Sequence, residues 1–281
     1  MSKKRQEPQY VMSVLNTPML NYKVYIMSGR EKRIAHLVTL LIGGIVGLTF
    51  YGGQFKDVDG IATTATMISN VVIFFATGII TNRIYLPIHC KNLCEKRRLL
   101  LTMQFRSFLE ALAVSLSSGM NMTESMLSAY NDLKVEYSDN AYIVAEVKEM
   151  LEGIQNNIPI ENMLESLGER SQIDDIKNFG VVFDICYRAG GNMKDIVRRT
   201  SNIISEKIEI NEEIETALAS NKTQFNAMMC IPVIMMLLLR IMSSQFSASF
   251  ATVPGIIAIT IAIGIFGIAY KLGLKIMNVK G

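Results

Sequence analysis

The sequence predicts an all-α, polytopic membrane protein with four transmembrane helices and a six-helix cytoplasmic bundle between the second and the third. Charged residues make up only 19% of the chain, whereas soluble proteins carry about 25%. The charges are absent from four long stretches and dense elsewhere. Four buried helices of a soluble protein would not explain segments of this length without a charge on any face.

The four uncharged stretches place the spans. They are residues 34–54, 61–80, 223–239 and 241–270. A helix needs roughly 20 apolar residues to cross a bilayer, so each of the first two stretches supplies one span. The last two divide into helices at about 225–242 and about 254–274, separated by a polar loop at 243–247.

The distribution of Lys and Arg predicts the orientation, because short cytoplasmic loops collect these residues. The sides expected to face the cytoplasm carry Lys3, Lys4, Arg5, Lys23, Arg30, Lys32 and Arg33 before the first span, Arg83, Lys91, Lys96, Arg97 and Arg98 after the second, and Lys271, Lys275 and Lys280 after the fourth. The other side offers Lys56 against Asp57 and Asp59, and Arg240 at the membrane edge, where its long side chain can reach the headgroups. Both termini and the central domain are therefore expected in the cytoplasm, with the chain in the inner or plasma membrane.

These observations divide the chain into four parts. We expect a cytoplasmic N-terminal segment, two transmembrane helices, a cytoplasmic helical bundle, and two further transmembrane helices with a short cytoplasmic tail, at 1–33, 34–86, 87–222 and 223–281.

Within the bundle, short amphipathic segments alternate with turn signals. The first helix, about 103–118, places Phe105, Phe108, Leu109, Leu112 and Leu116 on one face. Later helices are expected to start at Asn121, at about Asn140, at Pro159 and near a Ser171–Asp174 cap. The helix after that cap should bury Ile176, Phe179, Val182, Phe183 and Cys186.

The sixth helix of the bundle is expected to continue toward the bilayer. It starts at Asn192, and neither Gly nor Pro interrupts it before Pro232. Ile196, Ile203, Ile210 and Ala217 recur along it at intervals of seven residues, as on one face of a packed helix.

Two helix corners share a pattern. Residues 118–126 and 189–197 each contain a glycine stop followed by an Asn start and an acid one turn later. The residues concerned are Gly119, Asn121, Glu124, Gly190, Gly191, Asn192 and Asp195. Any corner with a Gly stop and an Asn start would look similar, so both an internal repeat and a common corner remain open.

Catalytic motifs are absent from the sequence. It contains no phosphate-binding loop of the Walker form, no nucleophile elbow and no His-Glu zinc motif. The two histidines lie beside the membrane and the four cysteines are scattered, so a four-ligand metal site is not expected. We expect no enzyme activity, no catalytic residue, no cofactor and no metal.

The chain resembles the type II secretion system F family. Three segments carry the resemblance: Phe105-Arg106-Ser107-Phe108-Leu109-Glu110-Ala111-Leu112, the corner at 118–126, and Arg188-Ala189-Gly190-Gly191-Asn192-Met193-Lys194-Asp195-Ile196-Val197. The resemblance covers about 105–220 and the two spans that follow. Secretion-type relatives usually have two copies of the soluble domain, whereas one copy here follows an extra pair of spans. That difference favours the single-domain platform proteins of tight-adherence (Tad/Flp) pilus systems.

The resemblance implies a non-enzymatic inner-membrane platform protein that couples a cytoplasmic hexameric ATPase to the extraction and polymerisation of pilin. The implied partners are that ATPase, pilin subunits, a paired platform protein or a second copy of the chain, and the lipid bilayer, with no nucleic acid. We expect the ATPase to contact the membrane-distal tips of the bundle. If the corners alternate between its two ends, the candidate contacts are Asp139, Glu169, Arg170, Asp174 and Asp175. Ordinary exposed loops would look the same.

Two other functions remain open from the sequence. Four spans could form an oligomeric transporter or channel, with Gly43, Gly44 and Gly47 allowing close helix packing. A membrane-tethered signalling adaptor would share the same topology.

Overall fold

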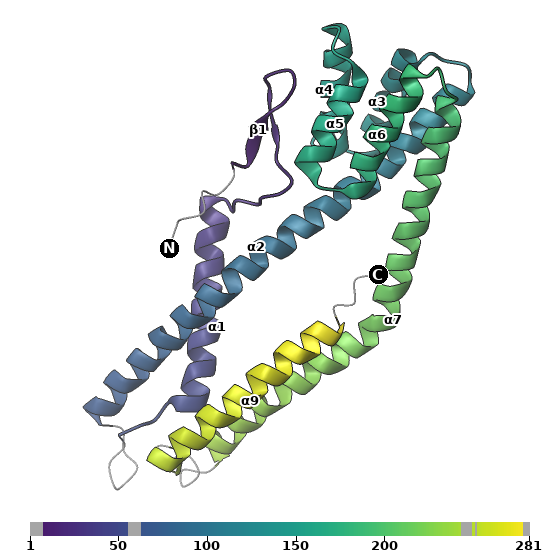
Figure 1. Ribbon diagram of the computed structural model, residues 1–281. Helices are drawn as coiled ribbons and strands as arrows, with labels where there is room; N and C mark the ends of the chain where they lie inside the picture. The colour runs from purple at the N-terminus through teal and green to yellow at the C-terminus, as the bar shows by residue number, and fades with distance from the viewer. Residues whose placement is uncertain (1–7, 56–62, 243–248, 251, 278–281) are drawn as a thin grey trace. The chain divides into compact units, whose positions relative to one another are not determined.

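The computed structural model describes residues 8–55, 63–242, 249–250 and 252–277. Its contacts divide the chain into two compact units (Figure 1). The first unit comprises Met1–Ile26 and Cys90–Ile210, and the second comprises Met27–His89 and Asn211–Gly281. Helices α2, Thr64–Ser117, and α7, Met193–Met242, each contribute residues to both units.

The predicted all-α polytopic architecture is confirmed. Within the described residues, four helices are long and apolar enough to cross a membrane: α1, Gly29–Tyr51, together with α2, α7 and α9, Val253–Met277. The predicted polar loop at 243–247, the charges Lys56, Asp57 and Asp59, and the terminal basic residues Lys3, Lys4, Arg5 and Lys280 lie outside the described residues. The orientation across the membrane stays a prediction.

In the second unit, glycines of α1 allow α2 to approach closely. A Cβ atom added at Gly47 would lie 2.1 Å from Thr77 Oγ1, and one added at Gly44 would lie 2.3 Å from the Phe74 ring. Near the start of α1, Asn82 of α2 brings its amide nitrogen within 2.7 Å of His36 Nδ1. The small residues noted in the sequence therefore pack these two helices together, as in other membrane helix pairs.

Arg240 of α7 contacts the carboxyl end of α1. Its guanidinium donates hydrogen bonds to the carbonyl oxygens of Gly52 at 2.6 Å, Phe50 at 2.8 Å and Leu48 at 3.4 Å. The last carbonyls of a helix lack partners within the helix, and the planar fork of Arg suits several acceptors at once. The predicted reach toward headgroups is therefore replaced by a contact within the protein.

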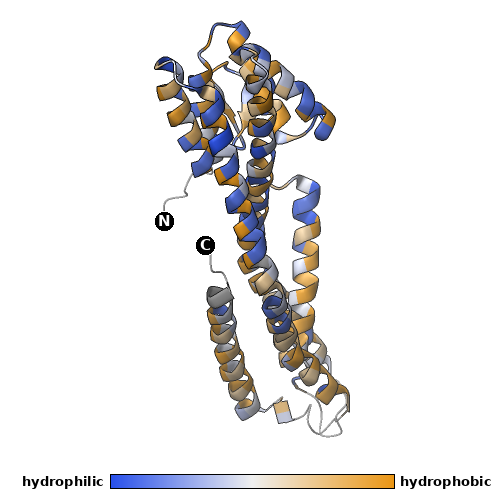
Figure 2. Cartoon of the chain, turned by 90° about the vertical axis from the view of Figure 1, so that its right-hand side faces the viewer, coloured by the Kyte–Doolittle hydropathy of each residue, from blue (hydrophilic) through white to orange (hydrophobic). Residues whose placement is uncertain are grey.

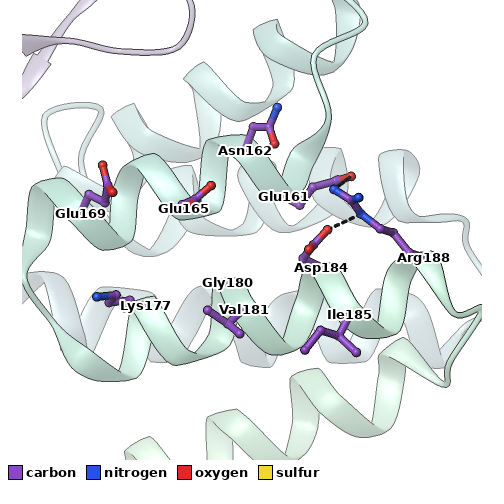
Figure 3. Close-up of a pocket in the computed structure, with 10 residues that line it drawn as sticks. All are labelled: Glu161, Asn162, Glu165, Glu169, Lys177, Gly180, Val181, Asp184, Ile185 and Arg188. Atoms are coloured by element: carbon purple, nitrogen blue, oxygen red, sulfur yellow. Dashed lines mark ion pairs between the residues drawn. The ribbon is translucent and has the colours of Figure 1, made fainter.

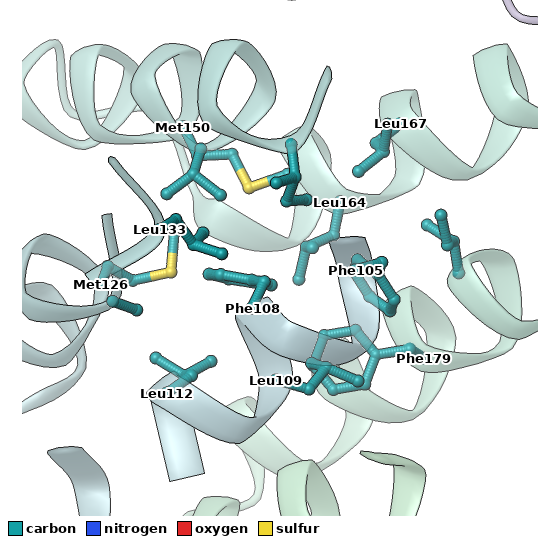
Figure 4. Packing of buried hydrophobic residues seen from close by; sticks show 14 of the residues in the cluster. Phe105, Phe108, Leu109, Leu112, Met126, Leu133, Met150, Leu164, Leu167 and Phe179 are labelled. Atoms are coloured by element: carbon teal, nitrogen blue, oxygen red, sulfur yellow. The ribbon is translucent and has the colours of Figure 1, made fainter. Parts of the chain in front are cut away.

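The first unit is a bundle of six helical segments. It combines residues 90–117 of α2 and 193–210 of α7 with four complete helices: α3, Met122–Glu136; α4, Tyr142–Gln155; α5, Ile160–Ser171; and α6, Asp174–Arg188. Figure 2 shows hydrophilic and hydrophobic residues alternating along these helices. The apolar side chains meet in one core (Figure 4), which includes Phe105, Phe108, Leu109, Leu112, Met126, Leu133, Met150, Leu164 and Phe179.

Both corners singled out in the sequence contain a glycine in the left-handed region, where side chains are disfavoured. The φ angle is +85° at Gly119 and +68° at Gly190. After Gly119, Asn121 and Glu124 form a reciprocal capping box. After Gly190, the Asn192 amide instead donates to the Asp195 carboxylate. The two corners therefore share the stop but differ in how the next helix begins.

Three details of the sequence interpretation are wrong. The N-cap of α6 is Ile173, without a side-chain cap, because Ser171 belongs to α5. Val182, expected inside, is 42% exposed. On α7, the buried face consists of Val197, Ser201, Ile204 and Ile208, whereas Ile203 and Ile210 of the seven-residue repeat are exposed.

The sequence analysis also missed a short β-hairpin in the first unit. Strand β1, Tyr10–Met12, pairs antiparallel with β2, Pro18–Leu20, so that Val11 lies opposite Met19. Strands of three residues are too short to show the alternation by which strands are recognised. We call residues 8–26, which contain this hairpin, the N-terminal hairpin segment.

Candidate functional site: the groove between α5 and α6

A surface groove runs between α5 and α6 (Figure 3). In the figure, Glu161, Glu165 and Glu169 follow one another along α5, and Lys177, Val181 and Ile185 follow one another along α6. The full lining consists of Glu161, Asn162, Glu165, Glu169, Lys177, Gly180, Val181, Asp184, Ile185 and Arg188. The groove therefore combines an apolar strip with a polar and mainly acidic rim.

Two glycines bring the helices together beneath the groove. A Cβ atom added at Gly168 of α5 would lie 3.0 Å from the Lys177 Cα atom, and one added at Gly180 of α6 would lie 3.5 Å from the Leu164 carbonyl carbon. Leu164, Leu167, Ile176 and Phe179 are buried on the inner side of the same two helices. This packing holds the rim residues in place on a rigid support.

The lining contains four carboxylates and two cations. They are Glu161, Glu165, Glu169 and Asp184, and Lys177 and Arg188. The Arg188 guanidinium lies 2.5 Å from the Asp184 carboxylate and 3.8 Å from Glu161. The other carboxylate oxygen of Glu161, Oε2, is buried and accepts no hydrogen bond from the described residues. Glu165 and Glu169 are exposed, and neither forms an ion pair with another described residue. The groove therefore presents excess negative charge.

Arg170, which follows Glu169, points into the bundle. Its guanidinium donates two hydrogen bonds to the Glu146 carboxylate of α4, at 2.9 and 2.6 Å, and lies 3.8 Å from Glu149. Burial raises the pKa of the Glu146 carboxyl above its usual value, and the Arg170 charge opposes that rise. Arg170 is therefore a structural residue, and the expectation that it contacts a partner is not retained.

The same network holds the N-terminal hairpin segment on the bundle. The Tyr22 hydroxyl donates to Glu146 at 2.9 Å, and Thr17 donates to Glu149 at 2.8 Å. The backbone of Tyr22 also donates to the Arg170 carbonyl, at 3.1 Å. Burial, and then the Glu146 charge, raise the pKa of Tyr22 well above its ordinary value. The segment is therefore fixed to α4 and α5 by side-chain and backbone contacts.

The structure places the other expected contact residues at two neighbouring loops. Asp139, between α3 and α4, pairs with Lys134 at 3.1 Å. Asp175, at the start of α6, pairs with Lys207 of α7 at 3.0 Å, while Asp174 is exposed. Glu169 lines the groove.

These loops lie at the end of the bundle where α2 enters it. There Arg98 of α2 donates to the Gln172 carbonyl, and Gln104 of α2 accepts from the Ile143 backbone. The corners between α2 and α3 and between α6 and α7 lie at the other end of the same unit (Figure 1). Along α2 and α7, those two corners are the ones remote from the apolar stretches. The expectation that Asp139, Glu169, Asp174 and Asp175 lie at the membrane-distal tips is therefore wrong, because their loops contact the parts of α2 and α7 nearer those stretches.

The sequence contained a signal for the buried network. Glu146 and Glu149 interleave with the apolar residues Ile143, Val147 and Met150 on α4 and share their buried face. Charged residues are seldom fully buried unless they are paired. Carboxylates within an apolar stripe therefore indicate an internal cation.

Residues 108–239 match the family model described as type II secretion system (T2SS), protein F. The matched range begins within α2, includes α3 to α6 and ends within α7. The predicted resemblance to this family is confirmed, while the tight-adherence branch stays a prediction. Neither the curated proteins nor the solved structures provided a match.

Proposed function

Starting from the match of residues 108–239 to T2SS protein F, we propose that this chain is the inner-membrane platform protein of a secretion or type IV pilus-like machine. The single observation that carries the proposal is that the match spans both the helical bundle and the apolar part of α7. A platform protein needs both parts, because it must receive a cytoplasmic partner and act within the bilayer. The proposed role requires no catalytic chemistry from the chain.

Within this proposal, a cytoplasmic ATPase binds the bundle and α7 transmits its displacement. Asp139, Glu169 and Asp174 offer it exposed carboxylates, and Asp175 borders them while pairing with Lys207. Helix α7 spans Met193–Met242 and so connects the matched bundle with the third apolar stretch. A displacement applied to the bundle would reach that stretch through a helical backbone, which resists bending between proline positions.

The proposed branch is the tight-adherence pilus system, and the proposed cargo is pilin. One matched region follows α1 and the apolar part of α2, and it precedes a fourth apolar helix, α9. This arrangement of one soluble domain within four spans supports the single-domain branch. The proposed orientation places the bundle and both termini in the cytoplasm, as the distribution of Lys and Arg predicts.

Deletion of the gene tests the cellular role. We expect a deletion strain to lose surface pili, counted by electron microscopy, and a plasmid copy to restore them. A strain that keeps normal pili would refute the pilus assignment. Hydrolysis of ATP by the purified chain, above that of a mock preparation, would contradict its non-enzymatic role.

Charge reversal tests the ATPase contact separately. The variant Asp139→Lys/Glu169→Lys/Asp174→Lys should lower co-purification of the ATPase at least about tenfold, because rim charges govern encounter and specificity. The matched control is Asp132→Lys, at an exposed position of α3. Unchanged co-purification by the triple variant, with normal amounts of protein in the membrane, would refute this contact.

A further inference from the structure

The groove between α5 and α6 has the chemistry of a binding site for a short basic segment. Its acidic rim presents Glu161, Glu165 and Glu169 on one helix, and its apolar strip presents Val181 and Ile185 on the other. Lys and Arg side chains fit such a surface, because their alkyl stems cover apolar atoms while their charged ends reach carboxylates. Val181 and Ile185 are 54% and 61% exposed, so the strip is open to an occupant.

The chain itself contains a segment of this composition. Residues 1–7 include the run Lys3-Lys4-Arg5 and lie outside the described part of the structure. We propose that this segment occupies the groove, with Lys3, Lys4 and Arg5 against the carboxylates of α5. The proposal goes beyond the platform function, and Glu169 is the residue that it shares with the proposed ATPase contact.

The N-terminal hairpin segment begins within reach of the groove. The Pro8 carbonyl accepts a hydrogen bond from the Asn21 side chain at 3.1 Å, and the next residue, Tyr22, bonds to the Arg170 backbone. Lys23 lines a hollow together with Glu169 and Lys177, which also line the near end of the groove. Pro8 therefore lies close to the point where α5 ends.

The chain length before Pro8 is comparable to the length of the acidic row on α5. Lys3 lies five residues before Pro8 and Arg5 lies three, so an extended chain places them about 16 and about 10 Å from Pro8. The eight helical steps from Glu169 to Glu161 cover about 12 Å. The chain from Pro8 to Lys3 is therefore longer than the acidic row, and that from Pro8 to Arg5 covers most of it, so the three basic residues can be distributed along the carboxylates of α5.

Occupation of the groove has a clear rival, because a basic segment also binds anionic lipid headgroups. The two cases differ in where the lysines are found. A lysine in the groove lies within bonding distance of a carboxylate of α5, whereas a lysine on lipid does not. Both contacts weaken with salt, so salt dependence alone cannot separate them.

Zero-length crosslinking provides the direct test. The full chain is reconstituted in nanodiscs of phosphatidylcholine, and of phosphatidylcholine with phosphatidylglycerol, and is treated with a carbodiimide that joins lysine amines to carboxylates. We expect mass spectrometry to find Lys3 or Lys4 joined to Glu161, Glu165 or Glu169 in both membranes. Links to other carboxylates only, or loss of the groove links in the anionic membrane, would overturn the proposal.

The same experiment distinguishes a contact within one chain from a contact between copies. An equal mixture of ¹⁵N-labelled and unlabelled protein is crosslinked in nanodiscs that contain two copies. If the segment binds its own groove, the linked peptides are all labelled or all unlabelled. Mixed pairs in the proportion expected for exchange would assign the segment to a second copy and overturn the proposal as stated.

Thiol accessibility provides an independent readout. In a background with Cys90, Cys94, Cys186 and Cys230 replaced by Ser, Val181→Cys reports on the groove, and Val135→Cys, at a position 91% exposed on α3, serves as the control. Replacing Lys3, Lys4 and Arg5 by Glu should speed labelling of Cys at 181 on the order of fivefold, as expected for three exposed ion pairs. Labelling at 135 should not change. An unchanged rate at 181 would overturn the proposal.

Discussion

Arg170 on α5 and Glu146 on α4 form a buried two-pronged ion pair, with nitrogen–oxygen distances of 2.9 and 2.6 Å. Removal of one partner leaves the other charge buried, which typically costs about 3–5 kcal/mol. The pair also contacts the N-terminal hairpin segment, because Arg170 donates to the Leu20 carbonyl at 3.2 Å. One contact therefore affects both the bundle and the segment docked on it.

We therefore predict that Arg170→Met lowers the free energy of unfolding of the first unit by about 3 kcal/mol or more. Thermal unfolding in detergent, followed by circular dichroism, measures the change. Lys148→Met is the control, because the Lys148–Glu152 pair is exposed and such pairs contribute little. A loss for Arg170→Met no larger than for the control would contradict the prediction.

The raised pKa of Tyr22 predicts loss of the docked segment at alkaline pH. The folded state keeps the phenol protonated above the ordinary value of 10.0, so its contribution to stability is complete below that pH and decreases as pH rises above it. Limited proteolysis of residues 8–26, followed across pH 8 to about 11, should show faster cleavage at the alkaline end. Tyr22→Phe should cleave faster at pH 8 and show a weaker pH dependence. A dependence equal to that of the wild type would assign the effect to other groups.

The capping box at the start of α3 predicts a local stability loss. The Asn121 side chain accepts from the Glu124 backbone at 2.9 Å, and the Glu124 carboxylate accepts from the Asn121 backbone at 3.2 Å. Asn121→Ala should cost about 1 kcal/mol, seen as faster amide hydrogen exchange in the first turn of α3. Asn131→Ala, at an exposed position inside the same helix, should leave that exchange unchanged. Equal exchange in the two variants would argue against the cap.

The close approach of α1 to α2 predicts that Gly47 cannot carry a branched side chain. A Cβ atom there would lie 2.1 Å from Thr77 Oγ1, and overpacking of this kind costs about 1–3 kcal/mol. Gly47→Val should therefore lower the unfolding temperature in detergent. Gly264→Val on α9, where a Cβ atom meets nothing within 4 Å among the described residues, is the matched control. Similar losses for both would indicate a general effect of valine in these helices.

The distribution of charged residues predicted the membrane helices, and the capping residues predicted the start of α3. The apolar stretches predicted the membrane helices, because a charge inside a bilayer is costly whatever the tertiary contacts. The Asn121–Glu124 cap was predictable because its bonds are local in sequence. By contrast, a repeat of one apolar residue in seven did not define the buried face of α7, where Val197, Ile204 and Ile208 are inside and Ile203 is not. A seven-residue interval fits several neighbouring faces of a helix equally well.

The features that the sequence did not predict depend on contacts between distant segments. The N-terminal hairpin segment is stabilised by Glu146 and Arg170, which are more than 120 residues away from Tyr22 in sequence. The groove depends on the packing of α5 on α6, so the acids of α5 could be counted but not assigned to one surface. Arg170 was assigned to an exposed tip because a charge next to a turn is usually solvated.

The three hydrogen bonds between Arg240 and the end of α1 limit how α7 can move. Three carbonyls at the end of α1 hold the guanidinium of α7, and sliding of α7 along its own axis would break all three together. Tilting of α7 about this point would disturb them less. The Arg240 end of α7 is therefore anchored to α1, and sliding along the helix axis is more restricted there than tilting about the contact.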